Sequence, residues 1–92
     1  MDVNHDKKNQ EFFIELPNEE KAILKYRWDG FGVAPFEINI PKSQNEKELG
    51  SALMDAIVMF VQQSSLRLKP RCDFAVEYMK SQTHLQHMVD YE

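Results

Sequence analysis

Cys72 and its neighbours form the segment with the clearest potential for chemistry. Cys72 is the single cysteine of the chain, it follows Arg71, and it stands where a strand is predicted to end and a helix to begin. A neighbouring cation and a helix N-terminus both favour the thiolate, which is the nucleophilic form of cysteine. A base would also be needed, and His84 and His87 are the only histidines outside the first ten residues. The alternative is a small buried thiol that packs under the helix.

The start of the predicted long helix is the second segment of interest. Asn45, followed three positions later by Glu48, has the spacing of a capping box, and acidic residues in a first turn suit the helix dipole. Lys47 in the same turn is a candidate partner for a phosphate group. A single exposed lysine is more often only solvated, so this turn also fits a helix that caps itself.

Two further groups of residues carry weaker signals. His84 and His87 are three positions apart on a predicted helix, which suits metal ligation, but two ligands without a third favour a simple surface pair. Arg67, Lys69 and Arg71 alternate along a predicted strand and so share one face. They are candidates to hold an anionic cofactor or an acidic partner, and a solvated or salt-bridged face is the alternative.

Alternating apolar patterns predict three strands ahead of the long helix. Residues 11–16 and residues 21–28 alternate apolar and polar side chains, the second more regularly than the first. The turn-forming residues between them favour an antiparallel hairpin. A third strand is predicted over residues 36–40, because Pro41 ends its ladder of hydrogen bonds.

The apolar period changes after these strands. Residues 46–63 show helical spacing in a stripe broad enough to lie against a sheet, and residues 66–69 alternate again. Strand, helix and strand then form a right-handed parallel crossover. A short helix N-capped by Asp73 is expected over residues 73–80, with final helical turns at residues 84–90. The predicted fold class is α/β (α+β): a mixed sheet with N-terminal antiparallel strands, a β-α-β crossover whose long helix covers one face, and short C-terminal helices.

Composition limits the class of protein. The chain has 92 residues, enough for one small core, and its 42% hydrophobic and 28% charged residues are typical of a globular domain. Eleven basic against fifteen acidic residues give a net charge of −4, which disfavours a nucleic-acid partner. One cysteine excludes an internal disulfide and a cysteine-rich zinc site.

The chain is expected to consist of a flexible N-terminal tail, residues 1–10, and a single domain, residues 11–92. The first residues lack the apolar region of a signal peptide. The longest apolar run, residues 56–61, is too short to span a membrane. The expected location is therefore cytoplasmic, without a membrane partner.

Two segments resemble a known family. Residues 40–53, IPKSQNEKELGSAL, resemble the coenzyme A loop of the GNAT N-acetyltransferases, and more narrowly that of the small Yjdj-type members. That group typically has Val-Pro, four residues and then Arg-Gly-x-Gly-x-Gly/Ala at the start of a long helix. Residues 68–78, LKPRCDFAVEY, are similar to the group's Pro-x-Cys-x-Phe at the end of its last strand. With chain length and strand order, the resemblance covers about residues 11–90.

The loop departs from the family pattern in a physically important way. Asn45 stands where the family has arginine, Glu46 and Glu48 stand at the first two glycines, and Gly50 with Ser51 follows the pattern. In the intact loop, glycines let main-chain N–H groups approach a pyrophosphate, so two carboxylates there are expected to weaken binding. Two other motifs differ: the group's His-Thr is Glu-Ile at residues 37–38, and its His-Pro-Glu-Tyr is Gln-Thr-His-Leu at residues 82–85.

The resemblance implies an acetyl-CoA-dependent N-acetyltransferase-like protein that transfers an acetyl group to an unidentified amine, with weak or lost activity. Cys72 is implied as a nucleophile and Tyr78 as a general acid toward the leaving thiolate. The alternative is a non-catalytic interaction module that keeps the fold, and no metal site is expected in either case. The implied binding residues for coenzyme A are Ile40, Lys47, Leu49, Gly50 and Ser51.

Overall fold

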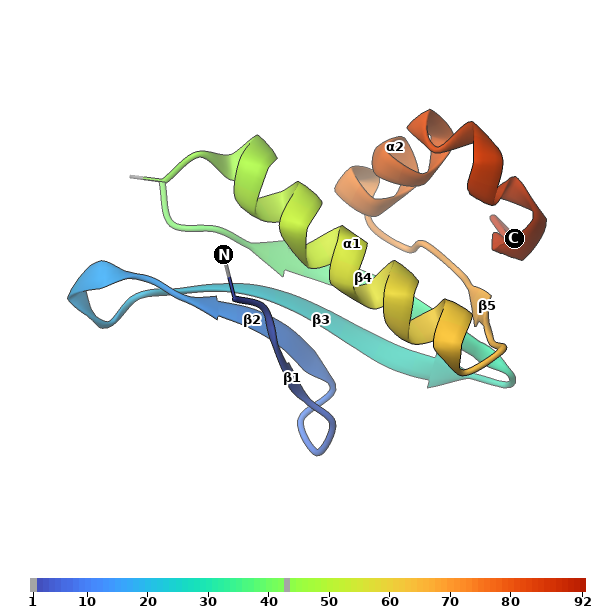
Figure 1. Cartoon of the computed structure of the whole chain (residues 1–92), viewed down its shortest axis with the longest axis horizontal. Coiled ribbons are helices and arrows are strands. Elements are labelled where there is room, and N and C mark those ends of the chain that lie inside the picture. The colour runs from blue at the N-terminus through green and yellow to red at the C-terminus, as the bar shows by residue number, and fades with distance from the viewer. Residues whose placement is uncertain (1, 43) are drawn as a thin grey trace.

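A computed structural model describes residues 2–42 and 44–92 of the chain. Within these residues one sheet has the strand order β1-β2-β3-β4-β5, in which β1 to β4 are antiparallel neighbours and β5 joins β4 in parallel. The predicted mixed sheet and the parallel crossover are therefore confirmed (Figure 1). The elements are β1 (Asn4–Asp6), β2 (Glu11–Glu15), η1 (Pro17–Glu19), β3 (Lys21–Asp29), β4 (Gly32–Asn39), α1 (Glu46–Gln63), β5 (Arg67–Leu68), α2 (Asp73–Ser81) and η2 (Thr83–Met88).

One face of the sheet and the apolar stripe of α1 form the core. The period-two pattern of β2 and β3 buries Phe12, Ile14 and Leu24 on that face, while residues between them remain exposed or half-buried. In Figure 1, α1 lies across the sheet with α2 beside it. The helix has the predicted bounds because its stripe is long and regular. Its buried residues are Leu49, Gly50, Leu53, Met54, Ile57, Val58 and Val61.

The first ten residues differ from the prediction of a flexible tail. Residues 4–6 form the edge strand β1, which pairs with β2. His5 anchors this strand, because its ring stacks on Phe12 with centroids 4.0 Å apart and its Nε2 lies 2.6 Å from the Tyr26 hydroxyl. The prediction of a tail is wrong for these residues, since one polar ring among charged neighbours does not look like a core residue in the sequence.

His5 makes the stability of the fold depend on pH. Burial lowers the pKa of His5 below its ordinary value of 6.5; the Lys7 charge adds to this effect and the Asp6 charge opposes it. The unfolded chain therefore takes up this proton first as the pH falls. We expect the free energy of unfolding to decrease from pH 6.5 down to the lower folded-state pKa, and this part of the pH dependence to be absent in His5→Phe. NMR titration of the His5 ring and denaturant unfolding at several pH values measure both quantities, and a ring pKa above 6.5 would contradict the expectation.

The third strand begins earlier than predicted. β4 starts at Gly32 instead of residue 36, because Pro35 lies inside it and reads as a strand breaker in the sequence. Pro35 has no N–H to donate, but its carbonyl oxygen still accepts a hydrogen bond from the Arg71 N–H at 2.8 Å. The strand can therefore contain this proline.

The C-terminal region follows the predicted order with two differences. Cys72, not Asp73, is the cap residue of α2, and Asp73 is the first helical residue. The final helical turns end at Met88, after which Val89 forms a parallel bridge with Leu68 instead of continuing the helix to residue 90. The chain end is thus bound to the free side of β5.

Candidate functional site

The parallel strands β4 and β5 diverge halfway along β4. Hydrogen bonds from the β5 side reach Val33 and Pro35, and beyond Pro35 the described residues of β4 have no partner strand on that side. Here β4 also contains a bulge, since Lys25 pairs with Glu37 and Tyr26 with Pro35, which leaves Phe36 as the extra residue. After β5 the chain leaves the sheet and enters α2, whereas β4 continues in the sheet to Asn39. The result is an open strand edge that leads to Ile40, a residue predicted to bind the cofactor.

Gly50 determines how closely α1 and α2 approach each other. It is buried, and a Cβ atom at this position would lie 2.3 Å from Cζ and 2.7 Å from Cε1 of Phe74. No side chain other than hydrogen fits at that distance without displacing the ring. The glycine predicted as part of a phosphate loop therefore also has a packing role, because it seats the Phe74 ring of α2 against the α1 backbone.

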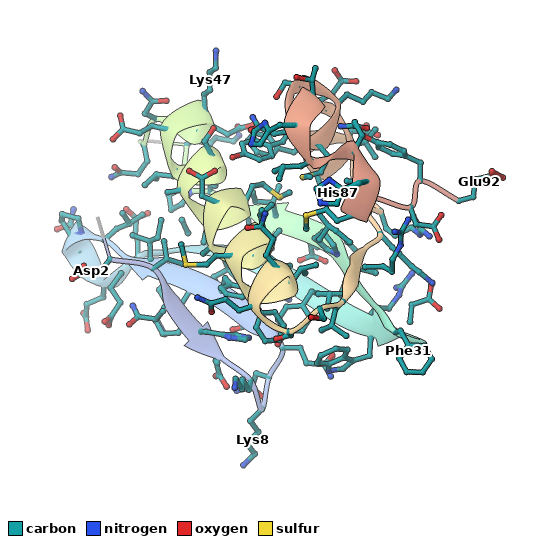
Figure 2. The ribbon with its side chains drawn as sticks, turned by 45° about the vertical axis from the view of Figure 1, so that its right-hand side comes forward. Asp2, Lys8, Phe31, Lys47, His87 and Glu92 are labelled. Carbon is teal, nitrogen blue, oxygen red and sulfur yellow. The ribbon has the colours of Figure 1, made fainter. Side chains whose placement is uncertain are left out.

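A cavity of about 380 Å³ lies between the first turns of α1 and the side of α2 that carries Phe74 and Tyr78. It brings together three of the predicted site residues, Lys47, Ser51 and Tyr78. Lys47 is exposed, and Figure 2 shows it extending outward at the N-terminal end of α1. The lining residues are Lys47, Ser51, Phe74, Glu77, Tyr78, Ser81 and Gln82. We refer to this space as the α1–α2 cavity.

Asp55 belongs to this region although the sequence analysis did not identify it. The Tyr78 hydroxyl donates a hydrogen bond to the Asp55 carboxylate, which ties α2 to α1. Partial burial raises the pKa of Asp55. The sequence did contain one signal that could have identified Asp55: positions 47, 51 and 55 are four residues apart and therefore share one side of the helix.

Cys72 does not have the environment of an activated nucleophile. It is half-buried, and burial raises the pKa of its thiol; the Asp73 charge acts in the same direction, while the main-chain N–H groups of Ala75 and Phe74 oppose it. The expected stabilisation of the thiolate is therefore wrong, because desolvation outweighs the helix N-terminus. Among the described residues, neither exposed histidine of η2 forms a hydrogen bond to the thiol.

The remaining basic residues of this region are engaged within the chain. The Arg67 guanidinium donates to the main-chain oxygens of His87 at 2.8 Å and Val89 at 3.2 Å. Arg71 donates to main-chain oxygens at Pro70 and near the chain end, and Lys69 forms an ion pair with Asp29 at 3.6 Å. The arginines hold the C-terminal segment in place rather than line a cofactor site.

Leu49 lies on the other side of α1, away from the α1–α2 cavity. It is buried and lines a second cavity of about 470 Å³, together with Asn45 and Glu48. The predicted N-cap is confirmed, since the Asn45 side chain accepts the Glu48 N–H at 3.1 Å. One of the two acidic residues at the loop glycine positions, Glu48, thus lines this second cavity, whereas Lys47 and Ser51 line the α1–α2 cavity.

A cluster of metal-ligating side chains and a membrane-spanning helix are both absent from residues 2–42 and 44–92. No three side chains of histidine, cysteine, aspartate or glutamate gather closely enough there to hold a metal ion. None of the helices in this part of the chain combines the length and apolar character needed to cross a membrane.

Comparisons with known proteins place the chain in a family. A family model described as GCN5-related N-acetyl-transferase matches residues 11–88. Protein NATD1 of Danio rerio is 27% identical over 88 residues, which are 94% of this chain and 80% of that protein. The solution structure of a GCN5-like protein from Staphylococcus aureus matches with a TM-score of 0.74 at 17% identity, covering 97% of this chain and 87% of that one, a likeness that shows the fold. Because the family model spans most of its length, the chain belongs to the GCN5-related N-acetyltransferase family.

Proposed function

We propose that this protein is a small acetyl-CoA-dependent N-acetyltransferase, of the Yjdj type, that binds its coenzyme weakly. The observation that supports this most directly is the divergence of β4 from β5 beyond Pro35, in the strand that precedes α1 in the chain. An open strand edge offers main-chain groups to an extended chain that carries amides, and a helix start attracts a diphosphate. The family of the chain makes acetyl-CoA the natural donor.

The residues around this opening suit the parts of that molecule. The edge of β4 near Ile40 would pair with the amides of the pantetheine arm, and the first-turn N–H groups near Lys47 would receive the diphosphate, because helix N–H groups there lack partners within the helix. Asn45 already occupies the N–H of Glu48, which removes one such donor. This loss, with the Glu46 charge at the same turn, is the reason we expect weak binding.

We propose direct attack by the acceptor amine rather than transfer through Cys72. The amine nitrogen would bond to the thioester carbonyl carbon, the carbon–sulfur bond would break, and the amine would release one proton to solvent. Because burial raises the pKa of the Cys72 thiol, that group is poorly suited to attack first. The Tyr78 hydroxyl is the proposed acid for the departing thiolate.

Titration of the isotope-labelled protein with acetyl-CoA tests this proposal. We expect amide shifts in residues 36–40, 45–51 and 72–78 with a dissociation constant near the millimolar range, about 4 kcal/mol of binding free energy. Lys47→Glu is expected to weaken binding by about tenfold. The matched control is Lys8→Glu, the same charge change in the exposed turn between β1 and β2. Absence of shifts at about 5 mM ligand would overturn the proposal.

A second candidate is a non-catalytic interaction module with the same fold. The observation that favours it is the self-capped start of α1, in which Asn45 supplies the acceptor that a ligand would otherwise provide. This candidate predicts that acetyl-CoA at millimolar concentration leaves all amide signals unchanged. The same titration therefore decides between the two.

A further inference from the structure

We propose that Asp55, a residue outside the coenzyme loop, sets the affinity of the α1–α2 cavity for an anionic ligand. This inference rests on the proposed function, because the ligand concerned is the phosphate-bearing part of coenzyme A. Asp55 would be a further residue that determines the affinity of the same site. Its charge lies in the middle of α1, not in the first turn of the helix.

The position of Asp55 supports this role. Lys47, Ser51 and Asp55 follow one another at four-residue intervals along one side of α1, and the first two line the cavity. The third is hydrogen-bonded to Tyr78, which lines the cavity from α2. Asp55 therefore stands at the end of the row of α1 side chains that a ligand in this cavity would approach.

The charges around the cavity give Asp55 its effect. The lining contains one cation, Lys47, and one anion, Glu77, so these two charges balance. Asp55 adds a second negative charge beside them, and a phosphate ligand would meet a net negative rim. Glu48 differs in its surroundings, since it lines the second cavity and is not among the residues that line the α1–α2 cavity.

The hydrogen bond adds a second effect. Tyr78 has one hydroxyl proton, and in this structure the Asp55 carboxylate accepts it. A ligand that needs the same proton must compete with a charged acceptor, and hydrogen bonds to charged acceptors are the stronger ones. While it is bonded to Asp55, the Tyr78 hydroxyl, which is the one tyrosine donor among the cavity-lining residues, cannot donate to the ligand.

Variants that each remove one negative charge from the protein test the inference. Asp55→Asn keeps the shape of the side chain and removes its charge, and Asp55→Ser removes most of the side chain as well. Glu92→Gln is the matched control, because it also removes one negative charge, from an exposed residue of the C-terminal segment that lines neither cavity. Calorimetric titration of each folded variant with coenzyme A should give about fivefold tighter binding for both Asp55 variants and an unchanged affinity for Glu92→Gln.

The outcomes separate this inference from the proposed function. If the unaltered protein binds coenzyme A and both Asp55 variants bind it equally or more weakly, the inference is overturned while the proposed function stands. The inference is also overturned if Glu92→Gln gains as much as Asp55→Asn, because net charge alone would then explain the change. If no protein in the series binds at millimolar coenzyme, the proposed function and the inference fail together.

Discussion

Gly50→Val is expected to lower the free energy of unfolding by about 3 kcal/mol, because overpacking a close contact forces neighbouring groups out of place. A Cβ atom alone would lie 2.3 Å from the Phe74 ring, and two further methyl groups enlarge the conflict. The ring lines the α1–α2 cavity, so its displacement should also abolish coenzyme binding. Urea denaturation measures the stability, and the acetyl-CoA titration measures the binding.

Three control variants separate the ring contact from other effects of valine. Lys47→Val places a β-branched residue at an exposed position of α1 and should cost only about 0.5 kcal/mol. Gly50→Ala should cost less than Gly50→Val, since alanine improves helix propensity by about 1 kcal/mol while its Cβ still meets the ring. In a Phe74→Ala background the Gly50→Val penalty should largely disappear. An equal penalty in both backgrounds would show that the ring contact is not its cause.

Leu53→Ala is expected to destabilise the protein by about 3–4 kcal/mol. Leu53 has no exposed surface and belongs to the core cluster between α1 and the sheet, so removing its side chain leaves a cavity. A domain of this length is stabilised by only about 5–14 kcal/mol, which makes this loss a large fraction of the total. Thermal and urea unfolding should both show it.

Met59→Ala is the comparison for the core substitution. Met59 lies on the same helix but is 58% exposed, so its truncation should change the free energy of unfolding by less than about 0.5 kcal/mol. A similar loss for both variants would mean that α1 does not bury its apolar stripe against the sheet as described. A large loss for Leu53→Ala alone would support the packing of α1.

Regular local patterns explain why much of the fold could be predicted. The apolar stripe of α1 runs over 18 residues, and a pattern of that length has few alternative interpretations. The alternation in β2 and β3 likewise specifies which face is buried. The strand β1 escaped prediction because its stability comes from His5 contacts with Phe12 and Tyr26, residues distant in the sequence.

For the candidate site, residue types were easier to predict than their surroundings. Lys47, Ser51 and Tyr78 were identified and lie around one cavity, whereas Leu49 lies across the helix. Asp55 was missed because an acidic residue in an amphipathic helix looks like any solvated side chain until its partner on α2 is known. The environment of Cys72 was misjudged for the same reason, since burial is a property of packing and not of neighbours in the chain.

By itself, the order of residues determined the strand and helix succession and the Asn45 cap, because these depend on spacing within a few residues, and the succession in turn implied the parallel crossover. Only the tertiary structure decided which charges share a cavity. Glu48 and Asp55 are both acidic residues of α1, yet Glu48 lines the cavity beside Asn45 and Leu49 whereas Asp55 bonds to Tyr78 of α2, because seven residues place Asp55 about two turns further along the helix. The pKa of Cys72 and the contact of Gly50 with Phe74 likewise arise when α2 packs against α1, since desolvation and close approach exist only in the folded chain.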